Sequence, residues 1–349
     1  MRNFSSAIWS ALAAAALFGG STPLVKLLIG DLPALLLAGL LYLGSGLGLA
    51  VFRLARDRGW KANGLVSGEW RWLAAAIFFG GLLGPFLLVF GLARTDAGAA
   101  SLMLNLEAAF TAMLAWVIFK ENADRRIVLG MSLIVAGGAV LAWPTFSGEN
   151  PDWIGPLAIA AACLCWAIDN NLTRRVSGSD ALFIAGAKGL TAGVISTGLA
   201  MLSGASFPAW PTAGAAMVVG LAGYGISLAL FVRALRDLGT ARAGAYFSTA
   251  PFVGAALSIL LLGEPTPTPF WLAACLMGVG VWLHLTEHHE HAHRHEPQAH
   301  THPHVHDLHH QHEHDFDWDG REPHSHSHSH ETLTHEHPHF PDIHHRHGH

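Results

Sequence analysis

The chain has little charge: only 13% of its 349 residues are Asp, Glu, Lys or Arg, whereas soluble domains carry about a quarter. This shortage excludes an ordinary soluble protein and indicates a membrane protein. Cysteine is scarce too, and the three cysteines all lie in apolar stretches, which excludes a disulfide framework. Histidine is missing from the first 283 residues. That part of the chain therefore lacks a nucleophile–base pair, and we expect no enzyme.

The histidines divide the chain into two parts. All 25 lie at or after His284, and the segment from His284 to the end carries a formal charge of 3 − 12 = −9 with neutral histidine. The residues before it carry 17 − 13 = +4. We expect an apolar part and a polar tail that lie in different solvents.

Apolar runs of about 20 residues, each long enough to cross a bilayer, recur along the first part with short polar breaks. We expect ten transmembrane helices, near residues 7–29, 33–54, 72–93, 97–119, 127–146, 153–173, 182–203, 213–235, 241–262 and 269–286. Alanine and glycine are abundant within them, as in "FFGGLLGPF", and small residues let helix backbones approach closely.

Lysine and arginine predict the orientation. With a cytoplasmic N-terminus, the inner loops hold 14 of these residues and the outer loops hold one, Arg94. Such an asymmetry is typical of the positive-inside pattern. We therefore expect a multi-pass protein of the cell (inner) membrane with both termini in the cytoplasm.

The two halves of the first part resemble each other. "GLARTDAGAASLMLNLEAAFTAMLAWVIFKEN" (91–122) aligns without gaps on "ALRDLGTARAGAYFSTAPFVGAALSILLLGEP" (234–265), and Glu121 meets Glu264. Because five spans per half is an odd number, the second half must be inverted relative to the first, which is a transporter architecture. The predicted fold class is an all-α membrane protein of ten transmembrane helices in two inverted five-helix repeats, 1–146 and 147–286, followed by a disordered cytoplasmic tail, 287–349.

The chain resembles the EamA-type transporters of the drug/metabolite transporter superfamily over about residues 5 to 286. The matching pieces are "ALFGGSTPLVK", "ASLMLNLEAAFTAMLAWVIFKE", "CWAIDNNLTRR" and "GAYFSTAPFVGAALSILLLGE". The resemblance implies a transporter with two five-helix repeats. The chain departs from the family pattern at Leu41, where an arginine is frequent, and at Ala108, where a proline is usual, whereas Pro251 keeps the proline in the second repeat.

Polar residues within the apolar runs are candidates for substrate binding or coupling, because ionisable groups at membrane depth are costly. Glu107 lies about midway along the fourth predicted helix, two residues after Asn105. A carboxylate there must find a partner, stay protonated or face water. Polar interaction between helices is the alternative for Glu107.

The other candidates lie closer to helix ends or have simpler interpretations. Lys26 and Lys188 either serve the substrate or extend to the nearer membrane surface along their four-carbon stems. Asp169 and Asn170 either serve the substrate or pair locally with neighbouring arginines at the interface. Tyr246 is either a substrate-stacking ring or a packing residue. Two basic groups with one or two acidic ones favour a zwitterionic or mixed-charge metabolite, and a carboxylate that changes protonation could couple transport to protons.

The tail has too few apolar residues to bury a core, so we expect it to be disordered. In an extended chain, residues i and i+2 project to the same side, and His-x-His therefore places imidazoles in neighbouring pairs. Imidazole favours Zn, Ni, Cu and Co. We expect several labile divalent-metal sites, formed by His302, His304, His306, His309, His310, His312, His314, His324, His326, His328 and His330. A solubilising or pH-responsive tail is the alternative.

These observations favour an exporter of a small polar metabolite that works by alternating access and requires no cofactor, with a tail that binds metal and senses or buffers it. Two alternatives stay open: a divalent-metal exporter whose tail collects the ion, and a metal-sensing membrane scaffold without transport. The expected partners are a small-molecule substrate, the lipid bilayer and divalent metal ions, with no nucleic acid, and the expected state is a monomer or a homodimer.

Overall fold

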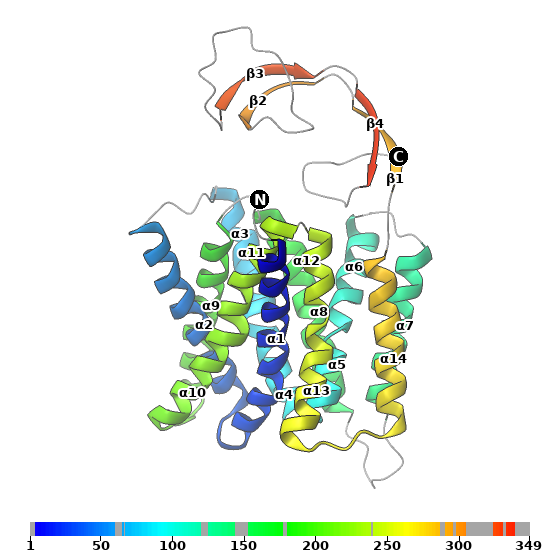
Figure 1. Cartoon of the computed structure of the whole chain (residues 1–349). Coiled ribbons are helices and arrows are strands. Elements are labelled where there is room, and N and C mark those ends of the chain that lie inside the picture. The colour runs from blue at the N-terminus through cyan, green and yellow to red at the C-terminus, as the bar shows by residue number, and fades with distance from the viewer. Residues whose placement is uncertain are drawn as a thin grey trace. The chain divides into compact units, whose positions relative to one another are not determined.

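The computed structural model describes residues 4–59, 65, 67–119, 125–143, 153–176, 180–238, 240–286, 290–295, 298–304, 324–330 and 333–338. It divides into two compact units, Met1–Glu287 and His288–His349. The first unit is a bundle of helices and the second contains short strands (Figure 1).

The helices follow the predicted apolar runs. The first half contains α1 (Phe4–Leu28), η1 (Ile29–Asp31), α2 (Ala34–Asp57), η2 (Ser67–Glu69), α3 (Trp70–Ala76), η3 (Ile77–Leu83), α4 (Gly84–Leu92), α5 (Ala97–Met103), α6 (Leu106–Phe119) and α7 (Arg125–Ala142). The second half contains α8 (Ile154–Thr173), η4 (Arg174–Val176), α9 (Ala181–Leu202), α10 (Trp210–Gly220), η5 (Leu221–Ile226), α11 (Ser227–Leu238), α12 (Thr240–Phe247), α13 (Ala250–Leu262) and α14 (Thr268–Leu285).

Within the described residues, nine helical segments are long and apolar enough to cross a membrane. The ninth predicted span, 241–262, is divided at Ser248 and Thr249 into α12 and α13, and of these only α13 stands out as a shorter apolar helix. The count of ten spans is therefore not confirmed. The N-terminal end of α1 and the C-terminal end of α14 lie on the same side of the helical unit (Figure 1).

The irregular turns of the two halves fall at equivalent places. In the gap-free alignment of the halves, residue 91 pairs with 234, and the same offset relates the π-helical turns η3 and η5. To within one residue, it also relates the interruption between α5 and α6 to the one between α12 and α13. The two halves therefore share local helix distortions as well as the order of their helices. Such π-turns widen a helix locally and are frequent at functional sites.

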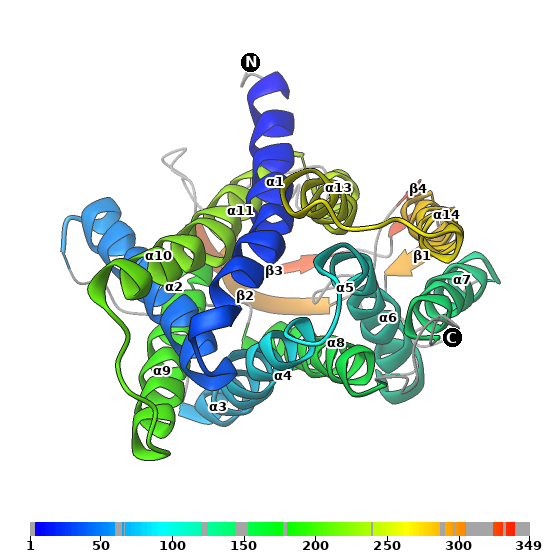
Figure 2. The same ribbon diagram turned by 90° about the horizontal axis from the view of Figure 1, so that it is seen from below.

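The helices of the two halves also make equivalent packing contacts. The helix α1 packs against α11 and α13, and the matching contacts in the other half are those of α8 with α4 and α6. The helices α2 and α9 pack together, as do α7 and α14. Seen from below, α7 and α14 lie at one end of the bundle, and α2, α9 and α10 lie at the other (Figure 2).

Glycines allow close helix crossings. A Cβ on Gly220 of α10 would overlap the carbonyl oxygen of Leu41 in α2, and one on Gly44 would overlap the carbonyl oxygen of Met217. Backbone atoms cannot swing aside as a flexible side chain can. The crossing of α2 and α10 therefore requires hydrogen in place of a side chain at these positions.

We expect Gly220→Ala to destabilise the folded protein by about 1–3 kcal/mol, because the added methyl group forces two helix backbones apart. Gly214→Ala, in the same helix, is the matched control, since a Cβ there meets nothing within 4 Å. Unfolding in detergent measures both variants. Equal stability of Gly220→Ala and Gly214→Ala would show that the helices do not cross as described.

An ion-pair cluster joins α2 to the start of α9. The Asp180 carboxylate accepts hydrogen bonds from Arg53 Nε at 3.0 Å and Arg56 Nη2 at 2.6 Å, and it caps α9 by accepting from Leu182 N at 3.0 Å. Burial alone would raise the pKa of Asp180, but these donors outweigh it and lower the pKa to about 2. The cluster therefore stabilises the fold at neutral pH, and this contribution is lost as the pH falls from about 4 through 2.

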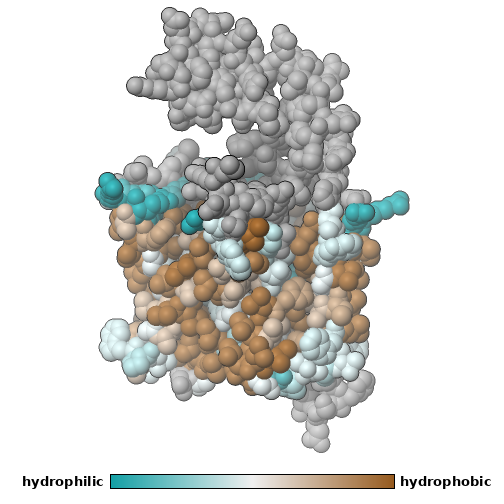
Figure 3. All heavy atoms as spheres, viewed as in Figure 1, coloured by the Kyte–Doolittle hydropathy of each residue, from teal (hydrophilic) through white to brown (hydrophobic). Residues whose placement is uncertain are grey.

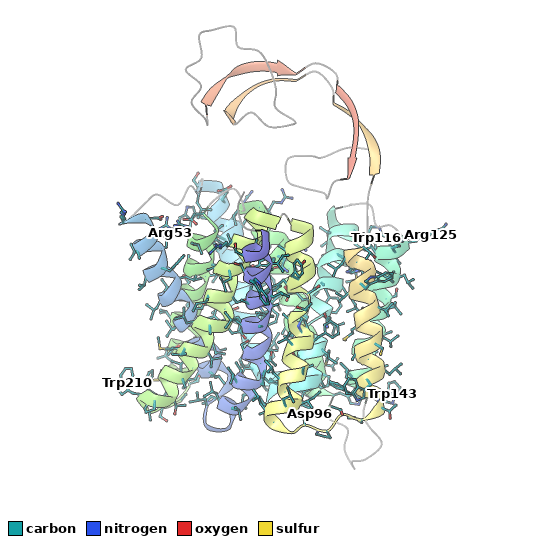
Figure 4. The ribbon with its side chains drawn as sticks, in the orientation of Figure 1. Arg53, Asp96, Trp116, Arg125, Trp143 and Trp210 are labelled. Carbon is teal, nitrogen blue, oxygen red and sulfur yellow. The ribbon has the colours of Figure 1, made fainter. Side chains whose placement is uncertain are left out.

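The surface of the helical unit suits a bilayer. Apolar side chains cover its middle and polar ones line one edge (Figure 3). Arg53 and Arg125 lie toward one edge, whereas Asp96, Trp143 and Trp210 lie toward the other (Figure 4). Trp143 and Trp210 are exposed, as expected for aromatic side chains at a membrane–water interface.

The tail contains four strands, β1 (Glu290–His295), β2 (Gln298–His304), β3 (His324–His330) and β4 (Leu333–Pro338). β1 pairs with β4, and β2 pairs with β3, both antiparallel. The expected disorder of the whole tail is therefore not confirmed. The physical reason is that alternation with a period of two suits an extended, paired backbone, so a shortage of apolar residues does not by itself prevent local pairing.

Candidate functional site

A buried ion pair links α8 to α9. Lys188 Nζ lies 2.5 and 2.6 Å from the two carboxylate oxygens of Asp169, and Thr173 Oγ1 donates to Asp169 Oδ1 at 2.9 Å. The Lys188 and Asp169 side chains are 17% and 9% exposed. Because each charge compensates the other, the pair tolerates a low-dielectric surrounding that neither charge alone would tolerate.

The π-turn η3 lies against this ion pair. A Cβ on Gly80 would overlap Asp169 Oδ2, so Gly80 leaves the space that the carboxylate occupies. The Gly80 carbonyl oxygen accepts from Tyr42 Oη at 3.0 Å and from Trp166 Nε1 at 3.1 Å. A wide turn frees a carbonyl from regular helix bonding, and here two aromatic side chains satisfy it.

Glu107 forms the second part of the site. Its Oε1 accepts a hydrogen bond from Asn170 Nδ2 at 2.8 Å, and the same amide lies 3.3 Å from Thr111 Oγ1. Glu107 is in the first turn of α6, in the first repeat, whereas Asn170 follows Asp169 in α8, in the second repeat. Glu107 is half-buried and Asn170 is exposed. We name the set Glu107, Asn170, Asp169 and Lys188 the polar cluster.

Lys26 lies apart from the polar cluster, at the turn between α4 and α5. Its Nζ donates to the carbonyl oxygens of Leu92 at 2.6 Å and Thr95 at 2.7 Å. Glu264 binds the other side of this turn, with its two carboxylate oxygens 2.6 Å from Ala97 N and 2.7 Å from Gly98 N. A cation at the end of α4 and a carboxylate at the start of α5 both suit the helix dipoles. Glu264 thereby ties the second repeat to the first.

We expect Glu264→Ala to destabilise the protein by about 1–3 kcal/mol, because two backbone N–H groups at the start of α5 lose their charged acceptor. Glu264→Gln keeps one acceptor oxygen and should lose less. Thermal unfolding in detergent gives the order of stability of the two variants. A Glu264→Ala protein as stable as Glu264→Gln and the unchanged protein would contradict the capping role.

Besides Lys26, two other predicted site residues lie outside the polar cluster. Asn105 is buried and donates to Leu102 O at 2.9 Å. Tyr246 packs beside Phe231 and the small residues of α1. Conversely, the structure brings Tyr42, Trp166 and Gly80 to the cluster, and the sequence did not single out these three residues as binding residues. Only the run of glycines in "FFGGLLGPF" hinted at close contact there.

Some of the predicted metal ligands lie within the described residues and others lie outside them. His302, His304, His324, His326, His328 and His330 lie on β2 and β3. His306, His309, His310, His312 and His314 lie outside the described residues. Among the described residues of the whole chain, no group of three or more His, Cys, Asp or Glu side chains is placed to hold a metal ion.

Two related helical halves, long apolar helices and a sparse polar cluster between the halves define a multi-pass membrane transporter. Residues 5–143 and 153–286 each match the EamA-like transporter family, and the chain belongs to this family. The match confirms the resemblance and the division of the membrane part into two repeats.

Curated relatives share parts of the membrane region. An uncharacterized transporter of Methanothermobacter thermautotrophicus is 29% identical over 210 residues, which cover 58% of this chain and 60% of that protein. A probable 4-amino-4-deoxy-L-arabinose-phosphoundecaprenol flippase subunit ArnE of Pseudomonas aeruginosa is 40% identical over 113 residues, 31% of this chain and 94% of that protein. A probable amino-acid metabolite efflux pump of Salmonella typhimurium is 28% identical over 173 residues, 48% of this chain and 52% of that protein.

A protein of known crystal structure has a fold similar to that of this chain. The TM-score is 0.58, and the match covers 79% of this chain and 95% of that chain. Its sequence identity to this chain is 20%, so the similarity concerns the fold alone. The match to the Methanothermobacter protein spans about three fifths of that relative's length.

Proposed function

We propose that the protein exports a small polar metabolite across the cytoplasmic membrane by alternating access between its two repeats. The observation that carries the proposal is the hydrogen bond between Glu107 and Asn170, because it joins α6 of one repeat to α8 of the other. A polar contact at such a boundary breaks or forms when one repeat moves against the other. A solute site at this boundary would change its affinity with the conformation, which supports the proposal.

The family relationship supports export of a small solute. One relative is a probable amino-acid metabolite efflux pump, and another is a probable flippase subunit for 4-amino-4-deoxy-L-arabinose-phosphoundecaprenol. The local contacts are compatible with protons as the coupling ion, since Glu107 is half-buried beside a neutral amide and its carboxylate can take up and release a proton.

Untargeted metabolomics of the medium from deletion and overexpression strains tests the proposal, with cell-associated metal measured in the same cultures. A metabolite exporter releases at least one polar solute more rapidly when overexpressed and leaves total metal unchanged. A fall in cell-associated metal without a released solute would favour a metal exporter instead. A medium that does not differ between the strains would contradict transport.

We further propose that the histidine-rich tail binds divalent metal. In the β2–β3 ladder, His300 is opposite His328, His302 is opposite His326 and His304 is opposite His324. Alternate positions of a strand belong to one face, so the backbone register assigns these six positions to the same face of the ribbon. Neutral imidazole is a ligand for Zn, Ni, Co and Cu. Cross-strand pairing adds His300 to the ligands expected from His-x-His spacing.

The full chain should bind more than one Zn²⁺ or Ni²⁺ at neutral pH, whereas a chain that ends at Glu287 and lacks the tail should not bind these ions. Affinity should collapse between about pH 7 and 5, because protons compete with metal for imidazole. Calorimetry in detergent measures both proteins. Equal binding by the two proteins, or no binding by either, would reject the metal-binding tail.

A further inference from the structure

The lysines of the spans are already engaged. Lys188 is neutralised by Asp169, with its Nζ within 2.6 Å of both carboxylate oxygens. Lys26 donates to two backbone carbonyls at the α4–α5 turn, away from the polar cluster. A substrate anion would have to displace Asp169 from Lys188 or compete with main-chain acceptors. The two basic groups that favoured a mixed-charge substrate are therefore not presented to a solute.

The Glu107 carboxylate, by contrast, makes no direct contact with a basic group among the described residues. Its hydrogen-bond donor is the amide of Asn170, which is neutral. Among the ion pairs of the described residues, none includes Glu107. Glu107 is half-buried and its partner Asn170 is exposed, so the pair is not sealed within the packed helices. When it is ionised, the polar cluster carries one uncompensated negative charge.

A row of aromatic rings begins at the same cluster. Tyr42 lies 5.7 Å from Tyr224, which lies 5.9 Å from Phe18, measured between ring centroids. Phe18 lies 5.5 Å from Phe247, and Phe247 lies 4.6 Å from Phe231. All five rings are half-buried. They come from α2, η5, α1, α12 and α11, so both repeats contribute.

Tyr42 connects the aromatic row to the polar cluster. Its hydroxyl donates to Gly80 O, and Gly80 is packed against the Asp169 carboxylate. Aromatic faces attract cations and provide apolar contact area. The combination of a free carboxylate with a row of rings suits a ligand that has a positive end and an apolar body.

We propose that the substrates of this site are organic ammonium ions with an apolar or aromatic body. The ammonium group pairs with the Glu107 carboxylate, and the body packs along the rings of Tyr42, Tyr224 and Phe18. This inference rests on the proposed function, because it names the class of solute that the exporter takes. An organic anion is disfavoured, since it would meet Glu107 while both lysines stay engaged.

Three probes of the same body separate the charge classes: 2-phenylethylamine as the cation, 2-phenylethanol as the neutral compound and 3-phenylpropionate as the anion. Binding to the purified full chain in detergent is measured by calorimetry. We expect the amine to bind about tenfold more tightly than the alcohol, the effect of one charge-assisted hydrogen bond, and the anion to bind most weakly. Glu107→Gln should abolish the preference for the amine, and Glu69→Gln should keep it.

A second variant tests the ring row. Tyr224→Leu should weaken the binding of the amine and of the alcohol by similar factors, because the substitution removes a ring contact and does not change the charge of the site. Anion binding tighter than amine binding, an amine preference that survives Glu107→Gln, or no binding of any probe at millimolar concentration would overturn the inference. Vesicles of the full chain separate this inference from the proposed function. Amine binding without flux contradicts only the export function, whereas Glu107-dependent flux of an anion contradicts only the substrate class.

Discussion

Lys188→Met is expected to destabilise the protein by about 3–5 kcal/mol, because it leaves the Asp169 carboxylate buried without its cation. The carboxylate is 9% exposed, and Gly80 on its other side supplies no charge. Asp169→Asn should have a similar effect by leaving Lys188 unpaired. The double variant Asp169→Asn/Lys188→Met should recover most of the loss, since no charge stays buried there.

A double-mutant cycle measured by unfolding in detergent gives the coupling energy of this pair, which we expect to reach at least about 1.5 kcal/mol. Thr173→Val is an additional comparison, because it removes one hydrogen bond to Asp169 and leaves the ion pair in place. If the stability loss of the double variant equals the sum of the losses of the two single variants, Asp169 and Lys188 do not neutralise each other.

Glu107→Gln is expected to abolish pH-dependent transport while leaving the fold intact. Glutamine keeps the shape and an acceptor oxygen for Asn170, but it cannot release a proton or carry a negative charge. Stability should stay within about 0.5 kcal/mol of the unchanged protein. The nearby charges, Asp169 and Lys188, compensate each other and are not altered by the substitution.

Solute release from vesicles over a series of pH values measures this effect. The rate through Glu107→Gln should fall to that of protein-free vesicles and should not vary with pH. Asn170→Ala supplies a comparison, since it removes the amide and keeps the titratable carboxylate. A Glu107→Gln protein with the ordinary rate and pH profile would exclude the coupling role of this residue.

The helical architecture could be predicted from the sequence because it depends on local composition. The length of the apolar runs located the membrane spans, and the gap-free alignment that pairs Glu121 with Glu264 revealed the repeat. The irregular turns were not predictable in the same way. The π-turns η3 and η5 lie inside continuous apolar runs, where one residue more per turn leaves no compositional signal.

The site was only partly predictable, because its contacts join distant residues. Glu107, Asp169, Asn170 and Lys188 were identifiable as costly polar groups, but their partners were not. For Lys188, reaching the membrane surface and serving the substrate were both open, and the structure pairs it with Asp169, 19 residues earlier. Glu264 marked the end of a repeated helix in the sequence, whereas its bonds to Ala97 and Gly98 required the packing of the two repeats.

Reconstitution of the full chain in vesicles tests proton-coupled export, with an imposed pH gradient and the solute identified in the medium. We expect the gradient to drive the solute to accumulate above its external concentration and a protonophore to abolish this accumulation. Glu107→Gln vesicles should not accumulate the solute. Accumulation that is unchanged by the protonophore, or that is equal in Glu107→Gln vesicles, would contradict proton-coupled transport through the polar cluster.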